Sequence, residues 1–375
     1  MSTLPSIFRT LLACQALTLA ASAWAADLAV VQIAPLSGVN GGVGWHMELG
    51  AQVAFDEVNS AGGVNGRKIR LVTVDETPDR VAEQARELAQ RENAVALFGM
   101  VGASSFNAVV QSQLPSSMQL PMIAVSSSAP SVHRIDDPYV FVTRPGVVDE
   151  LDTVFRHLAT VRTPKVALLV VDDPEGEDVI KAAQDRARAA GVELVSINKH
   201  LANSAQVDEA TAKILATPHQ AVVVASNTAA VAYFCRLYRR SGGTGQIVAL
   251  SSAEATQLAA VVGKEAARGV LISQVVPNPR DKRSLLMREF GNAYAKYGPR
   301  DVAPTLIMTE SYIAARVLLE GLQRSGKEPT GASLARALDA QRSVLIAGYR
   351  VNMKRSSTPR LTTLSVLDGE GTLRW

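Results

Sequence analysis

The sequence has few cysteines and little net charge. Its two cysteines are Cys14 and Cys235, and its formal net charge at pH 7 is +3. Because Cys14 falls in a segment that resembles a cleaved leader, the mature chain keeps one cysteine, and no intrachain disulfide is expected. We interpret Cys235 as a buried small hydrophobic residue. The small charge argues against nucleic acid or an anionic membrane as the partner.

Motifs for catalysis, cofactors and metals are also missing. The stretch "GVGWHM" (42–47) lacks the third glycine of the dinucleotide-binding fingerprint G-x-G-x-x-G. Asp75 lies too far along the chain to be the acidic residue that follows this fingerprint. The five histidines show no metal-ligand spacing, and neither a phosphate-binding P-loop nor G-x-S-x-G occurs. We therefore predict no catalytic residues, no cofactor and no metal. An oxidoreductase remains an alternative that rests only on this glycine stretch and predicts NAD binding.

The first 25 residues have the pattern of a secretory signal. One arginine is followed by the apolar run "LLACQALTLAASA", and "AWAA" places small residues at Ala23 and Ala25. This pattern predicts cleavage before Ala26. A membrane anchor and lipidation at Cys14 are the alternatives.

Short apolar strands alternate with amphipathic helices along the rest of the chain. The strands, such as "LAVVQI" (28–33) and "KVALLVV" (165–171), are continuously apolar, which is typical of parallel sheets covered on both faces. The alternation runs twice, over about 28–126 and 165–276, with prolines after each part. It predicts an α/β fold of two doubly wound parallel-sheet lobes, with a ligand cleft between them.

Glycines and small polar residues follow several of these strands. The stretch "PLSGVNGGVGWHMELG" (35–50) separates a strand from a helical pattern at 51–59, and we interpret it as a turn that holds a small polar group. Serine-rich turns follow four other strands. Their hydroxyls and the free N–H groups of helix starts suit an anion such as a carboxylate, although each serine is equally well explained as a helix cap. The residues concerned are Ala103–Ser105, Ser126–Ser128, Ser226–Thr228 and Ser251–Ser252.

The segment from "VVQIAPLSG" to "NSAGGVNGRKIRLVTVDETPD" (30–79) resembles the periplasmic binding proteins for branched-chain amino acids, which serve ABC importers. The resemblance continues through "PYVFVTRPG" and "ESYIAARVLLEGL" and covers nearly the whole mature chain. It implies the type I fold of that family, with two lobes joined by a three-crossover hinge. We expect one lobe to comprise 26–144 and 277–346 and the other 145–276 and 347–375. Val43 or Trp45 would contact the ligand's side group.

The resemblance also implies ligand contacts on the first lobe. The positions that hold the ligand carboxylate in the family fall on Ala103, Ser126 and Ser128. Since Ala103 has no hydroxyl, its backbone N–H or the neighbouring Ser104 would serve instead.

On the second lobe the implied contacts depart from the family pattern. Two family tyrosines fall on Glu175 and Asn227, and the acid that pairs with the ligand ammonium falls on Ser251. An unpaired buried ammonium costs on the order of 3–5 kcal/mol. Either Glu175 or Glu254 supplies the missing charge, or the ligand is an aromatic acid or short amide without an ammonium group.

The resemblance implies a monomeric periplasmic protein that carries an amino acid or similar small carboxylate to an ABC permease in the inner membrane. The lobes would close on the ligand by a hinge motion. A binding protein that reports to a membrane receptor is the alternative, since nothing in the chain excludes it.

Overall fold

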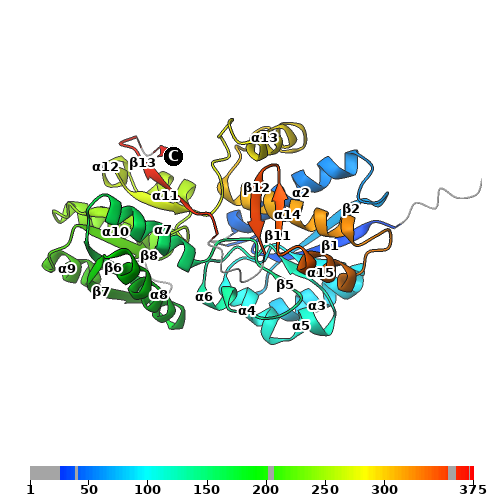
Figure 1. The fold of residues 1–375 in the computed structure, drawn as a ribbon, viewed down its shortest axis with the longest axis horizontal. Helices are drawn as coiled ribbons and strands as arrows, with labels where there is room; N and C mark the ends of the chain where they lie inside the picture. Colours follow the sequence, from blue (N-terminus) through cyan, green and yellow to red (C-terminus); the bar gives the residue numbers. More distant parts are fainter. Residues whose placement is uncertain (1–25, 39–40, 202–206, 354–359, 371) are drawn as a thin grey trace, which may run out of the picture.

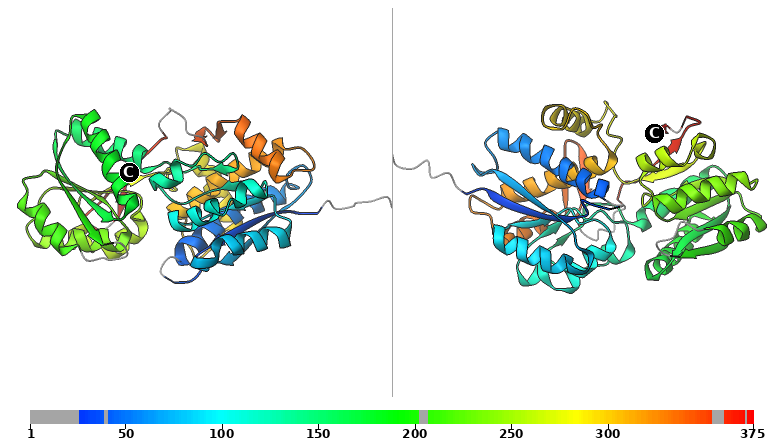
Figure 2. Two further views of the ribbon diagram at one scale, coloured as in Figure 1. Left: turned by 90° about the horizontal axis from the view of Figure 1, so that it is seen from below. Right: turned by 180° about the vertical axis from the view of Figure 1, so that it is seen from behind.

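The computed structural model describes residues 26–38, 41–201, 207–353, 360–370 and 372–375. Figure 1 shows two α/β lobes side by side, and Figure 2 shows the same division from two further directions. Each lobe is built on its own parallel or largely parallel sheet. The α/β fold with two parallel-sheet lobes that the sequence predicts is therefore confirmed.

The first lobe contains a five-stranded parallel sheet with helices on both faces. Its strands are, in order across the sheet, β2 (Ile69–Asp75), β1 (Leu28–Ala34), β3 (Ala96–Phe98), β4 (Met122–Ile123) and β5 (Val140–Phe141). Neighbouring residues of β1 enter different cores, since Val30 packs with helices α2 and α14 whereas Val31 packs with α3 and α4. Both faces of the strand are thus buried, which explains its continuously apolar sequence.

The helices of this lobe include α2, which is the long helix that follows β1. The lobe's helical elements are α2 (Gly41–Ser60), η1 (Pro78–Arg80), α3 (Val81–Glu92), α4 (Ala103–Gln111), α5 (Leu114–Ser117), α6 (Pro130–His133), α13 (Leu285–Tyr297), α14 (Leu306–Arg324) and α15 (Gly331–Ala340). A hairpin of β11 (Ser343–Ile346) and β12 (Tyr349–Asn352) lies beside α14.

The glycine stretch after β1 is helical from Gly41 onward, so the expected turn up to residue 50 is wrong. A Cβ on Gly41 would lie 2.9 Å from the Leu36 carbonyl oxygen, and one on Gly44 would lie 1.9 Å from that of Pro35. These glycines therefore let the helix start pack against the preceding backbone rather than form a ligand-holding turn.

The second lobe contains a seven-stranded sheet. Its strands are, in order, β14 (Leu373–Arg374), β13 (Thr363–Leu367), β10 (Leu271–Gln274), β9 (Gln246–Ala249), β8 (Ala221–Ala225), β6 (Lys165–Asp172) and β7 (Glu193–Leu201). The strands from β10 to β7 are parallel, whereas β13 pairs antiparallel with β10 and β14 with β13.

Helices cover both faces of the second sheet as well (Figure 1). They are α7 (Val147–Thr160), α8 (Pro174–Ala190), α9 (Asp208–Ala216), α10 (Thr228–Arg240), α11 (Ala255–Val261) and α12 (Lys264–Ala267). The ends of α8 follow from its sequence. The Asp173 side chain accepts a hydrogen bond from Gly176 N at 2.7 Å, Pro174 begins the helix, and Gly191 ends it with φ +71°.

The chain passes between the lobes three times: from β5 to α7, from β10 to α13, and from β12 to β13. The lobe boundaries expected from the sequence remain a proposal. Because β12 pairs with β11 beside α14, we propose to place the last boundary after Asn352 rather than after Ile346. Among the described helices, none is both long and apolar enough to span a bilayer.

Candidate ligand-binding site

A cavity of about 450 Å³ lies between the two lobes, where strands of both sheets give way to helices. Its volume is within the range of about 300–1,000 Å³ that small-molecule sites occupy. Much of its wall is aliphatic, contributed by Val43, Val101, Val147, Val171, Val179, Ala225, Leu250 and Ile307. The polar groups come from a few turns, so the cavity suits a ligand with an apolar body and a polar head.

Ser126 and Ser128 line the cavity from the first lobe. They lie in the turn after β4, which is fixed to the turn after β3 because Ser126 N donates to Met100 O at 2.8 Å and Gly102 N donates to Ser126 O at 3.2 Å. Gly102 also lines the cavity and precedes α4, whose N-terminus has no side-chain cap. The first N–H groups of α4 are therefore available to a ligand anion.

The second lobe contributes Glu175, Asn227 and Ser251. Glu175 is in the first turn of α8, and its Oε2 accepts a hydrogen bond from Ser131 N of the first lobe at 3.3 Å. Asn227 caps α10 through its Oδ1, which accepts from Ala230 N at 3.0 Å. Asn227 thus lines the cavity and caps the following helix at once.

Three of the residues predicted from the sequence do not line the cavity. Ala103 and Ser104 begin α4, next to the lining residue Gly102. Trp45 lies on α2 with 42% of its surface exposed, and Val43, two residues earlier, lines the cavity instead. The helical conformation of the glycine stretch explains this difference, because it turns position 45 away from the face that carries position 43.

Sequence reasoning missed Arg144, which lies at the centre of the site. Its Nε donates to Ser128 Oγ at 3.0 Å, its Nη2 donates to Ser251 Oγ at 2.7 Å, and its Nη1 donates to the Glu310 carboxylate. Arg144 follows β5 on the first crossing, so this side chain joins a turn of the first lobe to a turn of the second. Ser128 Oγ and Ser251 Oγ are themselves 3.4 Å apart.

Glu310, on α14, is almost wholly buried beside Arg144. Burial raises the pKa of Glu310 above its ordinary value, while the Arg144 charge and a hydrogen bond from Ser126 oppose that rise. The sequence signal that could have found this pair is a single charge inside an apolar stretch, as in "LIMTESYIAA" (306–315). A charge that is buried in this way needs a partner.

Glu150, on α7, is the second buried acid that sequence reasoning missed. Its Oε2 accepts from Ser251 N and its Oε1 accepts from Ser251 Oγ, both at 2.8 Å. It is fully buried, yet it belongs to the residues around the cavity. Glu254, which the sequence offered as a counter-charge, also lines the cavity, and its carboxylate caps α11 by accepting from Thr256 N at 3.1 Å and Gln257 N at 2.6 Å.

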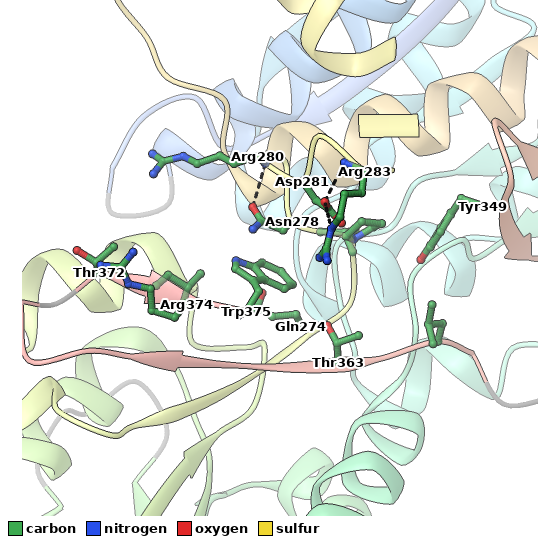
Figure 3. A pocket seen from close by; sticks show the side chains of 14 residues that line it. Gln274, Asn278, Arg280, Asp281, Arg283, Tyr349, Thr363, Thr372, Arg374 and Trp375 are labelled. Carbon is green, nitrogen blue, oxygen red and sulfur yellow. Dashed lines mark hydrogen bonds and ion pairs between the residues drawn. The ribbon is translucent and has the colours of Figure 1, made fainter. Parts of the chain in front are cut away.

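A second cavity, of about 540 Å³, lies between the second crossing and the last strands of the chain. Figure 3 shows Trp375 between Thr372 and Asp281, with Arg283 and Arg374 nearby. Arg283 and Arg374 are largely exposed and pair with Asp281 and Asp368. None of the residues predicted from the sequence lines this cavity. The interlobe cavity is therefore the candidate site.

The described residues include no group of three or more His, Cys, Asp or Glu side chains placed to hold a metal ion. The cleft therefore offers hydroxyl groups, backbone N–H groups, one guanidinium and carboxylates to a ligand.

Comparisons with known proteins agree with this geometry. The profile of the family described as "Periplasmic binding protein" matches residues 28–358. A curated relative, Leu/Ile/Val-binding protein homolog 8 from Brucella abortus, is 25% identical over 93% of this chain and 90% of its own length.

Two solved structures have the same fold. A substrate-binding periplasmic protein from Ralstonia solanacearum is 30% identical, with a TM-score of 0.82 over 93% of this chain and 99% of its own. A solute-binding protein of an ABC transporter from R. palustris, in complex with benzoate, is 18% identical, with a TM-score of 0.76 over 92% of this chain and 94% of its own.

Proposed function

Because the chain belongs to the periplasmic binding protein family, and is a solute-binding protein of an ABC transporter rather than an enzyme, we propose that it carries an amino acid or a similar small carboxylate. We propose further that it works in the periplasm, after removal of residues 1–25, and delivers its ligand to a permease in the inner membrane. The names of related proteins support both amino acids and small carboxylates without an amine as ligands. One relative has a Leu/Ile/Val-binding name, and one structural neighbour holds benzoate.

The observation that carries the proposal is the convergence of polar groups from both lobes on one cavity with aliphatic walls. Ser128 of the first lobe and Ser251 of the second are hydrogen-bonded to the same guanidinium, that of Arg144. A ligand bound between these turns contacts both lobes at once, so its binding favours the closed arrangement of the hinge.

Each part of the cavity has a proposed role. The uncapped N-terminus of α4, which begins beside the lining residue Gly102, holds the ligand carboxylate through the backbone N–H groups of its first turn. The side-chain amide of Asn227 donates from the second lobe. The aliphatic wall, including Val43 and Val179, packs against the ligand's apolar body.

A thermal-shift screen of the mature chain tests the proposal. The screen should contain amino acids, aromatic acids and short amides, since these are the ligand classes that the cleft suits. A ligand at 100 times its Kd stabilises the folded protein by about 2.7 kcal/mol. If none of these compounds raises the unfolding temperature, the proposed ligand class is wrong.

Two matched tryptophan variants locate the binding site. Val179 lines the cavity from α8 and is half-buried, so Val179→Trp should fill part of the cavity and abolish the shift. Val261 is 53% exposed on α11 and does not line the cavity, so Val261→Trp should leave the shift intact. Equal shifts for the two variants would place the ligand elsewhere.

A further inference from the structure

We infer that Glu150, acting through Ser251, makes the Ser251 end of the cleft accept hydrogen bonds rather than donate them, and so selects a ligand that presents a protonated amine there. Glu150 is a positioning residue in this scheme, because Ser251 makes the contact. The inference rests on the proposed function, whose ligand class includes both amino acids and acids without an amine.

The first step is the direction of the hydrogen bonds at Ser251. Arginine can only donate, so Arg144 Nη2 uses one lone pair of Ser251 Oγ, at 2.7 Å. A serine hydroxyl has one proton, and the nearest acceptor for it is Glu150 Oε1, at 2.8 Å. The hydroxyl proton of Ser251 is therefore directed into the protein. Towards a ligand Ser251 Oγ can only accept, through its second lone pair, for which Ser128 Oγ at 3.4 Å is the neighbouring protein hydroxyl.

The neighbouring serine hydroxyls are used in the same way. Ser252 Oγ donates to the carbonyl oxygen of Ser226 at 2.9 Å. On the first lobe, Ser126 hydrogen-bonds to the Glu310 carboxylate, which also accepts from Arg144. These protons are unavailable to a ligand carboxylate at this end of the cleft, which reverses the simple expectation that serine turns donate to an anion.

The second step is the charge around the cavity. Its described lining includes the carboxylates of Glu150, Asp173, Glu175 and Glu254 and one guanidinium, that of Arg144. Each nitrogen of that guanidinium already has a protein oxygen as acceptor. A ligand carboxylate placed next to Ser251 would lie one hydroxyl away from the Glu150 carboxylate, beside a guanidinium that is already paired with Glu310. An ammonium there would meet an acceptor, in a site where two buried carboxylates surround one guanidinium.

Glu150 itself lacks an ion-pair partner in the described ranges, where no cationic nitrogen comes within 4.0 Å of its carboxylate. Its stabilisation comes from the two hydrogen bonds of Ser251. A buried carboxylate without a cation favours a ligand that brings a positive charge close to it.

The variant Glu150→Gln separates this role from a merely structural one. The glutamine carbonyl oxygen can still accept from Ser251 N, but its N–H₂ group donates to Ser251 Oγ. The Ser251 proton is then free to point into the cavity, and the negative charge is gone. A structural role would weaken all ligands alike, whereas the inferred role changes the preference between ligands.

The experiment is calorimetric titration with two matched pairs: leucine with 4-methylpentanoate, and phenylalanine with 3-phenylpropanoate. Wild-type protein should bind the amine-bearing member of a pair at least tenfold more tightly. Glu150→Gln should lower that ratio by about ten- to hundredfold, as expected for a lost hydrogen bond to a charged group. Glu265→Gln, an exposed change of the same kind on α12, should leave the ratio unchanged.

Each outcome decides the inference. Tighter wild-type binding of the member without an amine overturns it while the proposed function stands, and this holds even if Glu150→Gln does not fold. An unchanged ratio in a folded Glu150→Gln also overturns it. Failure of all four compounds to bind overturns the proposed ligand class together with the inference.

Discussion

Arg360 donates a hydrogen bond from its Nη1 to Nδ1 of His133, at 2.9 Å. The same guanidinium donates to the carbonyl oxygens of Arg144, at 2.8 Å, and Val142, at 3.2 Å. The third crossing is thus attached to the first crossing and to α6. Because arginine only donates, Nδ1 of His133 accepts, and the ring proton lies on Nε2, which is 3.3 Å from Ser127 O. His133 is therefore neutral in the folded protein.

This arrangement predicts that the folded protein loses unfolding free energy in acid, because a buried neutral histidine lies at the hinge. Burial, together with the charge of Arg360, lowers the pKa of His133 from 6.5 to about 4. Between these values the unfolded chain binds a proton that the folded chain does not, so stability is complete above pH 6.5 and falls as the pH drops towards 4. The loss amounts to about 3 kcal/mol for such a shift.

Urea unfolding at pH 7 and pH 4.5 measures this effect. The difference in unfolding free energy between the two pH values should be smaller in His133→Gln than in the wild type. His157→Gln, on α7, is the control and should retain the wild-type difference. An equal pH dependence in all three proteins would contradict the assignment.

A second prediction concerns the buried pair of Arg144 and Glu310. Arg144→Met leaves the Glu310 carboxylate buried without its cation, and should cost about 3–5 kcal/mol of unfolding free energy. Arg144→Met combined with Glu310→Met removes both charges and should be less destabilising than the single change. Denaturant unfolding at pH 7 measures both, and a double variant that is less stable than the single one would refute the prediction.

A third prediction compares two glycines of α2. A Cβ on Gly50 would lie 2.3 Å from the Met308 carbonyl oxygen, so α2 could not keep its close packing on α14. Gly50→Ala should therefore destabilise by about 1–3 kcal/mol. Gly42→Ala meets nothing within 4 Å and should be neutral or stabilise by about 0.5–1 kcal/mol, because alanine favours helix. In thermal unfolding, Gly50→Ala should lower the midpoint temperature, whereas Gly42→Ala should leave it unchanged or raise it.

A fourth prediction concerns Cys235. This side chain is buried in α10, and burial raises the pKa of its thiol to about 12. The thiolate is the reactive form, so a disulfide reagent such as Ellman's should modify Cys235 only as fast as the protein unfolds. A second cysteine placed at the exposed position of Val261 should react at once in the folded protein. Rapid reaction of native Cys235 would show that it is accessible.

Most strands and helix ends of this fold can be predicted from short stretches of the sequence. The uninterrupted apolar run of β6 indicates a strand buried on both faces, and all its central residues are buried. Asp173, Pro174 and Gly191 mark the two ends of α8. These features can be read from the sequence because each depends on residues within a few positions of one another. The glycine stretch after β1 was misread because its glycines serve close packing within a helix.

The pairs at the centre of the site depend on residues far apart in the sequence. Arg144 and Glu310 are separated by 166 positions, and Glu150 and Ser251 by 101. Sequence alone identified the serine turns at the strand ends, because parallel strands bring such turns to one edge of a sheet. Only the tertiary structure decided that Ser251 meets Glu150 and Ser126 meets Glu310. The direction of these two hydroxyl protons depends on those partners.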